Sequence, residues 1–212
     1  MPFQKRNPMN NNFKVHRNIN KDVNNILSFI TPNSVGIEIG VWAGDTSEKF
    51  INRGVKHLHL VDSWSVEAYL TQKNPEKGSN ENFLNIMSRH AKSAKAEDVQ
   101  EFFNDLYDFV HSRYKKFPEV TIHRKPSVEF FKDFTEKVDW VYVDGAHSYD
   151  ECLEDLIASL SVIKPGGWLI GDDYEWELTR GKPGVTKAVN EFMQKYNLKP
   201  VRSGERQFVI GV

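Results

Sequence analysis

Short apolar runs alternate with amphipathic stretches along the first third of the chain. The apolar run from Val35 to Gly40 predicts a strand, and Asp45 and Glu48, spaced as in a capping box, predict a helix that ends at Gly54. Alternating apolar and polar residues from His57 to Trp64 predict a second strand. A strand, a glycine turn, a helix and a second strand in this order are typical of a parallel βαβ unit.

The residues before this unit fall into two parts. Apolar residues at helical spacing from Val23 to Ile30 predict a helix that begins after Asn20, as its N-cap, and ends at Pro32. Residues 1–19 carry several basic side chains and no acidic one, which predicts an arm that is either loosely packed or in contact with a partner subunit or an anionic substrate. One domain over residues 20–212 is therefore expected.

The segment from Val66 to Phe117 breaks the alternation, because it is too long for a simple connection. Apolar residues at helical spacing between Val99 and Val110 predict a core helix. Residues 66–96 are interpreted as a helical insertion, within which the polar stretch from Thr71 to Glu81 predicts a loop. This loop either moves over a neighbouring site as a lid or is an ordinary surface loop.

The second half of the chain returns to alternating strands and helices. A helical stripe from Cys152 to Ile163 predicts a helix that residues 165–167 (Pro-Gly-Gly) end, and Gly184 to Tyr196 predicts another helix. Pro200 to Val212 predicts a terminal strand or a hairpin with Gly204 in its turn. The alternation favours an α/β fold. Strands are predicted over Val120–Arg124, Val138–Gly145 and Gly167–Asp173.

Composition and charge exclude several classes of protein. The chain is 39% hydrophobic and 27% charged, and its longest apolar run is far shorter than the roughly 18 residues of a membrane span. It has no apolar secretory core near its start and a lone Cys152, which favours the cytoplasm. A net charge of −1 and a pI near 6.7 give no field that attracts nucleic acid. We therefore expect neither a membrane nor a nucleic-acid partner, while a homo-oligomer stays open.

A glycine motif marks the turn after the first strand. Gly40 and Gly44 of EIGVWAG let backbone approach a ligand where a helix begins. The spacing differs from the GxGxxG of dinucleotide-binding folds, and Glu38 would repel a pyrophosphate. A carboxylate there suits a ligand that carries an ammonium and a sulfonium. The alternative is a glycine-rich turn required only by packing.

The second strand ends in VDSW. Asp62 lies 18 positions after Gly44, where a carboxylate can accept hydrogen bonds from the hydroxyls of a ribose. Ser63 and Trp64 follow it and join the expected ligand site, with Trp64 either covering an adenine face or packing in the core. The two motifs together predict a site for a nucleoside-bearing ligand.

Three aspartates follow two later strands. Asp144 ends one predicted strand, and Asp172 and Asp173 end the next, so their carboxylates should converge at the carboxyl edge of the sheet. Three hard oxygen ligands suit Mg²⁺ or a similar ion. The alternative is that Asp172 or Asp173 caps a turn while Asp144 contacts the cofactor. His147 could reach the same cleft as a general base, or it could be a loop histidine bonded to backbone.

The motifs together resemble a known family. EIGVWAG, VDSW, VDGAHSYDECLEDL, KPGGWLIGDDY and GVTKAVNEF are similar to motifs of the class I S-adenosylmethionine-dependent methyltransferases, and among them to the metal-dependent O-methyltransferases that act on macrolide and aminocoumarin sugars. The likeness spans about Val35 to Met193. It implies a doubly wound, Rossmann-like, mostly parallel seven-stranded sheet with an antiparallel terminal strand.

The resemblance also implies roles for individual residues. It places the methyl donor at Glu38, Gly40 and Asp62, a metal at Asp144, Asp172 and Asp173, and a proton acceptor at His147. Some sugar methyltransferases of this group have a second aspartate near the position of Ala146 and His147. The insertion over residues 66–96 matches no part of the family, so the resemblance does not identify the acceptor.

The sequence thus predicts an S-adenosylmethionine-dependent, Mg²⁺-assisted O-methyltransferase that acts on a hydroxyl of a small molecule, such as a sugar or a vicinal diol. A metal-dependent glycosyltransferase is an alternative, because an aspartate pair can hold a metal against a nucleotide sugar, although Glu38 opposes it. A second alternative is a non-catalytic module that only binds the donor.

Overall fold

The computed structural model describes residues 23–70, 85, 87–89, 91, 95–175, 184–204 and 206–212 of the 212-residue chain. The predictions for the arm over residues 1–19, for Asn20 as an N-cap and for the loop from Thr71 to Glu81 lie outside the described residues.

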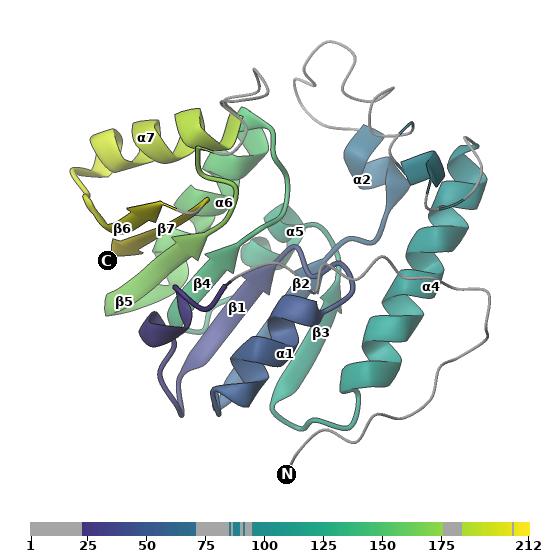
Figure 1. Ribbon diagram of the computed structural model, residues 1–212, viewed down its shortest axis with the longest axis horizontal. Helices are drawn as coiled ribbons and strands as arrows, with labels where there is room; N and C mark the ends of the chain where they lie inside the picture. The colour runs from purple at the N-terminus through teal and green to yellow at the C-terminus, as the bar shows by residue number, and fades with distance from the viewer. Residues whose placement is uncertain are drawn as a thin grey trace.

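A seven-stranded sheet forms the centre of the molecule, in the order β3-β2-β1-β4-β5-β7-β6 (Figure 1). The neighbours from β3 to β5 pair in parallel, whereas β7 pairs antiparallel with both β5 and β6. The predicted α/β fold with an antiparallel terminal strand is confirmed. The strands are β1 (Val35–Ile39), β2 (His57–Asp62), β3 (Val120–Arg124), β4 (Val138–Val143), β5 (Ile163–Gly171), β6 (Pro200–Gly204) and β7 (Gln207–Gly211).

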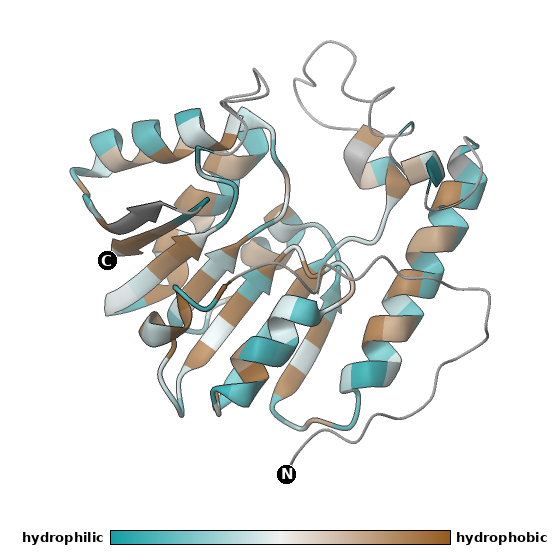
Figure 2. Ribbon diagram, viewed as in Figure 1, coloured by the Kyte–Doolittle hydropathy of each residue, from teal (hydrophilic) through white to brown (hydrophobic). Residues whose placement is uncertain are grey.

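Helices cover both faces of the sheet, and hydrophobic residues predominate along its central strands (Figure 2). The side chains of these strands pack into hydrophobic clusters on both faces. On β4, Trp140 packs on the face that α1 and α4 cover, and Val141 packs on the face of α5, α6 and α7. Two hydrophobic cores therefore flank the sheet. The helices are α1 (Asp45–Asn52), α2 (Val66–Leu70), α4 (Ala96–Tyr114), α5 (Ser127–Asp133), α6 (Tyr149–Val162) and α7 (Gly184–Tyr196), and a 3₁₀ turn, η1, spans Leu27–Phe29.

Three predicted helix boundaries were wrong. The helix expected from Val23 to Ile30 is only the short η1, although Val23, Ile26 and Ile30 are fully buried as the pattern required. The expected capping box at Asp45 is absent: Gly44 is the N-cap of α1, with φ at 75° and no side-chain cap.

The third error lies between α6 and β5. α6 ends at Val162 and β5 begins at the next residue, so the Pro-Gly-Gly at 165–167 lies inside the strand. Gly166 has φ at 82°, and the register with β4 shifts between Val138 and Trp140. The glycines therefore mark an irregularity in a strand, and helix α5 was not predicted because its seven residues are too few to show a helical period.

A cluster of histidines joins β2 and β3 beneath α5. His59 Nδ1 lies 3.1 Å from His123 Nε2, and the His59 ring lies 4.6 Å from that of His57. Burial, and then the neighbouring His57 and His123, lower the pKa of His59 to about 4. The imidazole of His59 is therefore neutral in the folded protein at pH values where it would already be protonated in the unfolded chain.

This cluster predicts acid sensitivity. Since the folded pKa of His59 lies below the unfolded value of 6.5, stability is retained above pH 6.5 and lost as the pH falls towards 4. Between pH 7 and pH 5 the free energy of unfolding should fall by roughly 2 kcal/mol through this residue. Urea denaturation at several pH values checks this for the wild type, for His59→Phe and for the control His111→Phe, whose histidine is exposed on α4. If His59→Phe leaves the change of unfolding free energy with pH as it is in the wild type, the prediction is contradicted.

Candidate functional site

The turn between β1 and α1 depends on its glycines. Gly40 has φ at 84°, and a Cβ there would lie 2.1 Å from the carbonyl oxygen of Asp144. Gly44 has φ at 75°, and a Cβ there would lie 2.6 Å from the ring of Tyr114. Both positions require a residue without a side chain, and the close approach at Gly40 brings the ends of β1 and β4 together.

We expect Gly40→Ala to lower the free energy of unfolding by more than about 1 kcal/mol, because it adds both backbone strain and a collision with the backbone of Asp144. Gly54→Ala is the matched control: Gly54 also has a positive φ of 76°, but a Cβ there meets nothing within 4 Å. Denaturation curves that show equal losses for the two variants would mean that the contact with β4 contributes nothing.

Asp62 holds the glycine turn from the end of β2. One carboxylate oxygen accepts hydrogen bonds from the backbone N–H groups of Val41 and Trp42, at 2.9 and 3.0 Å, and the other accepts one from Trp64 at 2.9 Å. Trp42 and Trp64 both have a positive φ, which is rare for bulky residues, and the carboxylate fixes them there. Burial raises the pKa of Asp62, while these three donors oppose the rise.

The two tryptophans have different places. Trp64 is 1% exposed, its indole N–H donates to the carbonyl of Trp42 at 3.1 Å, and its ring packs 5.3 Å from that of Tyr107. The structure thus places Trp64 in the core, which was one of the two interpretations of its sequence. Trp42, which the sequence analysis did not single out, lines the cavity described below.

Glu38 lies behind the turn. It is fully buried on β1 and accepts a hydrogen bond from the hydroxyl of Ser47 on α1 at 2.5 Å. In the described part of the chain the cavity wall includes Gly40 and Asp62 but not Glu38. The hydrogen bond with Ser47 joins Glu38 on β1 to helix α1.

Helix α4 secures the turn from the other side. Arg113 donates to the carbonyl of Ala43 and to Asp45, each at 3.0 Å, and also binds Glu48. The hydroxyl of Tyr114 donates to the carbonyl of Gly44. Sequence reasoning missed these contacts, because α4 lies more than 60 positions further along the chain and its spacing shows only a core helix.

A cavity of about 980 Å³ extends along the carboxyl edge of the sheet. Of the residues selected from the sequence, Gly40, Asp62, Ser63, Asp144, His147 and Asp173 line it. Its wall also includes residues that were not selected from the sequence, namely Ser127, Glu151, Asp155 and Arg206. The cavity therefore joins the expected donor and metal regions in one space.

Asp155 of α6 is a buried acid in this wall. It is 5% exposed, and burial raises its pKa to about 7, with Glu151 and Glu154 adding to the rise and a hydrogen bond with Ser127 opposing it. A carboxyl group with this pKa is part neutral near pH 7 and can then donate a hydrogen bond as well as accept one.

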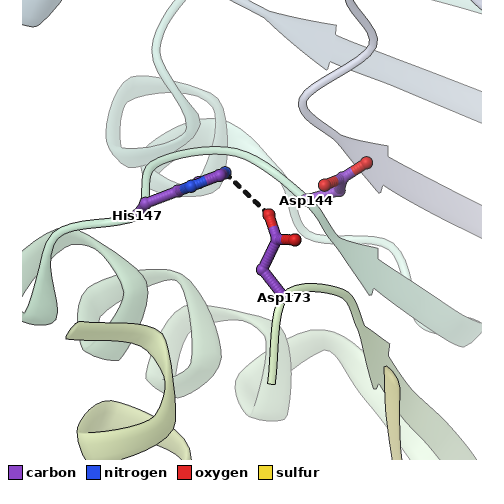
Figure 3. A group of neighbouring side chains, drawn as sticks. All are labelled: Asp144, His147 and Asp173. Carbon is purple, nitrogen blue, oxygen red and sulfur yellow. Dashed lines mark ion pairs between the residues drawn. The ribbon is translucent and has the colours of Figure 1, made fainter. Parts of the chain in front are cut away.

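Asp144, His147 and Asp173 form a compact group in the wall of the cavity (Figure 3). One ligand atom from each lies within 4.8 Å of the others, and His147 Nε2 lies 3.0 Å from Asp173 Oδ2. Asp144 follows β4 and Asp173 follows β5, where the loops of a parallel sheet meet. Arg206, in the turn between β6 and β7, binds the other oxygen of Asp173.

Asp172 does not join this group. Among the described residues, the set with metal-ligand geometry contains Asp173 and not its neighbour. The Asp172 side chain is 5% exposed and borders a small space of about 10 Å³, whose wall also includes Asp144, His147 and Asp173. The structure thus brings together two of the three aspartates expected as ligands and adds His147 to them.

A family profile described as a methyltransferase domain matches residues 37–174, which include the glycine turn, Asp62, Asp144 and Asp173. The chain belongs to the class I S-adenosylmethionine-dependent methyltransferases. The donor of this methyltransferase is accordingly S-adenosylmethionine. No curated protein matches the sequence.

Solved structures of methyltransferases share its fold. The Streptococcus mutans protein SMU.1697c in complex with SAH has a TM-score of 0.56 at 12% identity, over 94% of this chain and 100% of that one. The N-methyltransferase NodS from Bradyrhizobium japonicum has 0.54 at 13% identity, over 92% and 96%. The O-methyltransferase NovP has 0.50 at 18% identity, over 92% and 77%. At these identities the likeness shows the fold and leaves the acceptor atom open.

None of the helices in the part of this methyltransferase that the structure describes combines the length and hydropathy needed to cross a membrane.

Proposed function

We propose that this methyltransferase transfers the methyl group of S-adenosylmethionine to a hydroxyl oxygen of a small molecule, such as a sugar or a vicinal diol, with the help of a divalent metal ion. One observation carries the proposal. Asp144, His147 and Asp173 converge in the same cavity that Gly40 and Asp62 line, so groups suited to a metal and groups suited to the donor share one space.

The donor region suits a cation. Asp62 and Asp144 line it, and the donor carries a sulfonium and an ammonium. A carboxylate can accept about four hydrogen bonds, and backbone N–H groups take three of those available on Asp62. In the proposal Asp62 therefore accepts one bond from a ribose hydroxyl, and its main effect is to fix the turn beneath the donor.

The metal region suits a divalent cation. Two carboxylates balance its charge, and an imidazole nitrogen is a common ligand. When bound, such an ion lowers the pKa of a hydroxyl that binds to it. An imidazole beside two carboxylates can accept a proton from the acceptor or bind the ion itself, and the direction in which its ring points decides between these uses.

The size of the cavity supports a reaction between two ligands. About 980 Å³ lies at the upper end of the range for small-molecule sites, which is roughly 300 to 1,000 Å³. Donor and acceptor can then lie side by side between the turn at Gly40 and the group around Asp173. Alignment of the methyl carbon with the acceptor oxygen can contribute about 7–11 kcal/mol to catalysis.

A product screen tests the proposed reaction. The full-length protein is incubated with S-adenosylmethionine, a divalent metal and a panel of sugars, catechols and amines, and methylated products are identified by mass spectrometry. Methylation of hydroxyls is expected. Methylation of amines alone would overturn the assignment of the acceptor atom, and donor binding without any product would support the non-catalytic alternative.

Metal removal gives a further prediction. After exhaustive EDTA treatment the protein should lose methyl transfer by at least about 100-fold and recover it on addition of a divalent cation, because the ion polarises the attacking oxygen. The release of S-adenosylhomocysteine is measured before and after. Full activity of the EDTA-treated protein would refute metal assistance.

A further inference from the structure

The ring of His147 points its outer nitrogen towards the carboxylate group. Nε2 lies 3.0 Å from Asp173 Oδ2, and Figure 3 shows the ring directed at Asp173, with Asp144 beside it. The other nitrogen, Nδ1, is bonded to Cγ, the ring carbon attached to Cβ, so it lies nearer to the backbone than Nε2 does. This orientation fits a ligand better than a proton acceptor.

The spacing of the three side chains also fits an ion. Ligands bound at about 2.1 Å from one ion are separated by about 3 to 4 Å. The donor atoms of Asp144, His147 and Asp173 lie within 4.8 Å of one another, so small side-chain movements would close the set. Asp144 and Asp173 also provide the two negative charges that balance a divalent cation.

Arg206 offsets one of the two negative charges of this group. Its guanidinium binds Asp173 Oδ1 from the β6–β7 turn, and its side chain is 46% exposed, whereas that of Asp173 is 6% exposed. A metal ion and this guanidinium would compete for the same buried carboxylate. Because Arg206 sits at the surface, it can leave Asp173 without losing contact with water.

We propose that His147 binds the metal through Nε2, together with Asp144 and Asp173, and that the ion is a first-row transition metal rather than Mg²⁺. The inference rests on the proposed function only in taking the ion as part of methyl transfer. An imidazole ligand favours transition metals, whereas Mg²⁺ prefers an all-oxygen set and keeps several waters. The ligand set therefore determines which ion the protein selects.

Metal binding to the full-length protein tests the ligand set without any acceptor. Titration calorimetry with Mn²⁺, Zn²⁺ and Mg²⁺ should show transition-metal binding at least tenfold tighter than Mg²⁺ binding. Electron spin echo envelope modulation of bound Mn²⁺ should show coupling to a ¹⁴N nucleus. Equal affinity for Mg²⁺, no metal binding, or no nitrogen coupling in the wild type would each overturn the proposal.

Variants make the test specific. His147→Gln should abolish the nitrogen coupling and weaken Mn²⁺ binding at least tenfold, and His147→Asp should move the preference towards Mg²⁺. Asp172→Asn should keep the nitrogen coupling and change Mn²⁺ affinity less than threefold. Arg206→Gln should tighten Mn²⁺ binding, because it removes the competing cation. Nitrogen coupling that persists in His147→Gln would overturn the assignment, and melting curves confirm that each variant folds.

The outcomes separate this inference from the proposed function. If the wild type shows nitrogen coupling but methylates no hydroxyl with any of the metals, the proposed function is refuted and the assignment of His147 as a metal ligand stands. If hydroxyls are methylated with Mg²⁺ and no nitrogen coupling is seen, the proposed function stands and the assignment of His147 as a metal ligand is refuted.

Discussion

Replacing Asp173 with asparagine should abolish divalent-metal binding and slow methyl transfer by at least about 100-fold, while S-adenosylmethionine affinity stays within about threefold of the wild type. Asparagine keeps the shape of the side chain and removes its charge. The donor region, at Gly40 and Asp62, makes no use of this carboxylate in the proposal. The effect should therefore fall on the rate and not on donor binding.

Two measurements check this separation. Calorimetry gives the affinities for Mn²⁺ and for S-adenosylhomocysteine, and product release gives the rate. Asp108→Asn is the matched control, because Asp108 is an exposed aspartate on α4. Normal metal affinity in Asp173→Asn would remove Asp173 from the ligand set, and a matching loss of donor affinity would show that the two regions are not independent.

Replacing Asp62 with alanine should weaken donor binding at least tenfold. A hydrogen bond to a charged group contributes about 1.5–3 kcal/mol, and three backbone N–H groups would lose such an acceptor in this variant. The backbone of Trp42 and Trp64, which has a positive φ, would then lack the hydrogen bonds to Asp62 that stabilise it. The variant should be less stable as well, so donor affinity is measured where it is fully folded.

A donor analogue separates the two effects of Asp62. If its carboxylate contacts the ribose, S-adenosylhomocysteine that lacks the ribose hydroxyls should bind the wild type more weakly, and this difference should shrink in Asp62→Ala. If Asp62 acts only on the turn, the penalty for removing the hydroxyls is the same in both proteins. Unchanged affinity for intact S-adenosylhomocysteine in a folded Asp62→Ala would exclude both roles.

The strand pattern could be predicted because burial on both faces leaves a direct trace in the sequence. The runs over Val35–Ile39, Val120–Arg124 and Val138–Val143 are nearly continuous in apolar residues or alternate regularly, and each became a strand. Helix α7 was predicted with the same bounds, Gly184–Tyr196, that the structure shows. Helices of seven residues or fewer, such as α5, contain too few turns for a helical period to be recognised in the sequence.

The candidate site could be located but not resolved into contacts. Asp172 and Asp173 are adjacent, so the sequence could not tell which of them faces the cavity. The backbone of Asp173 has φ at 61°, and this conformation cannot be predicted from the residue type. The two interpretations of Trp64 stayed open for the same reason, since Trp64 itself has a positive φ of 41°. Turn geometry directs these side chains, and neither spacing nor composition encodes it.

The same limit applied to His147. Its position three residues after Asp144 indicated the right cleft, but the use of an imidazole depends on which nitrogen faces the cleft. Only the arrangement of the β4–α6 loop against Asp173 shows this direction.

The contacts of α4 have a consequence for protein engineering. Its first half meets the end of β2, where Gln100 accepts from the N–H of Val66 at 2.9 Å and donates to the carbonyl of Trp64 at 3.1 Å. Its last turn meets the donor turn through Arg113 and Tyr114. A chimera can be made to change the acceptor by exchanging the whole region from α2 to α4. Such a chimera would also lose the contacts of Arg113 and Tyr114 with the glycine turn, which the donor site requires. Exchanges that end before Gln100 would keep both attachments of the helix intact.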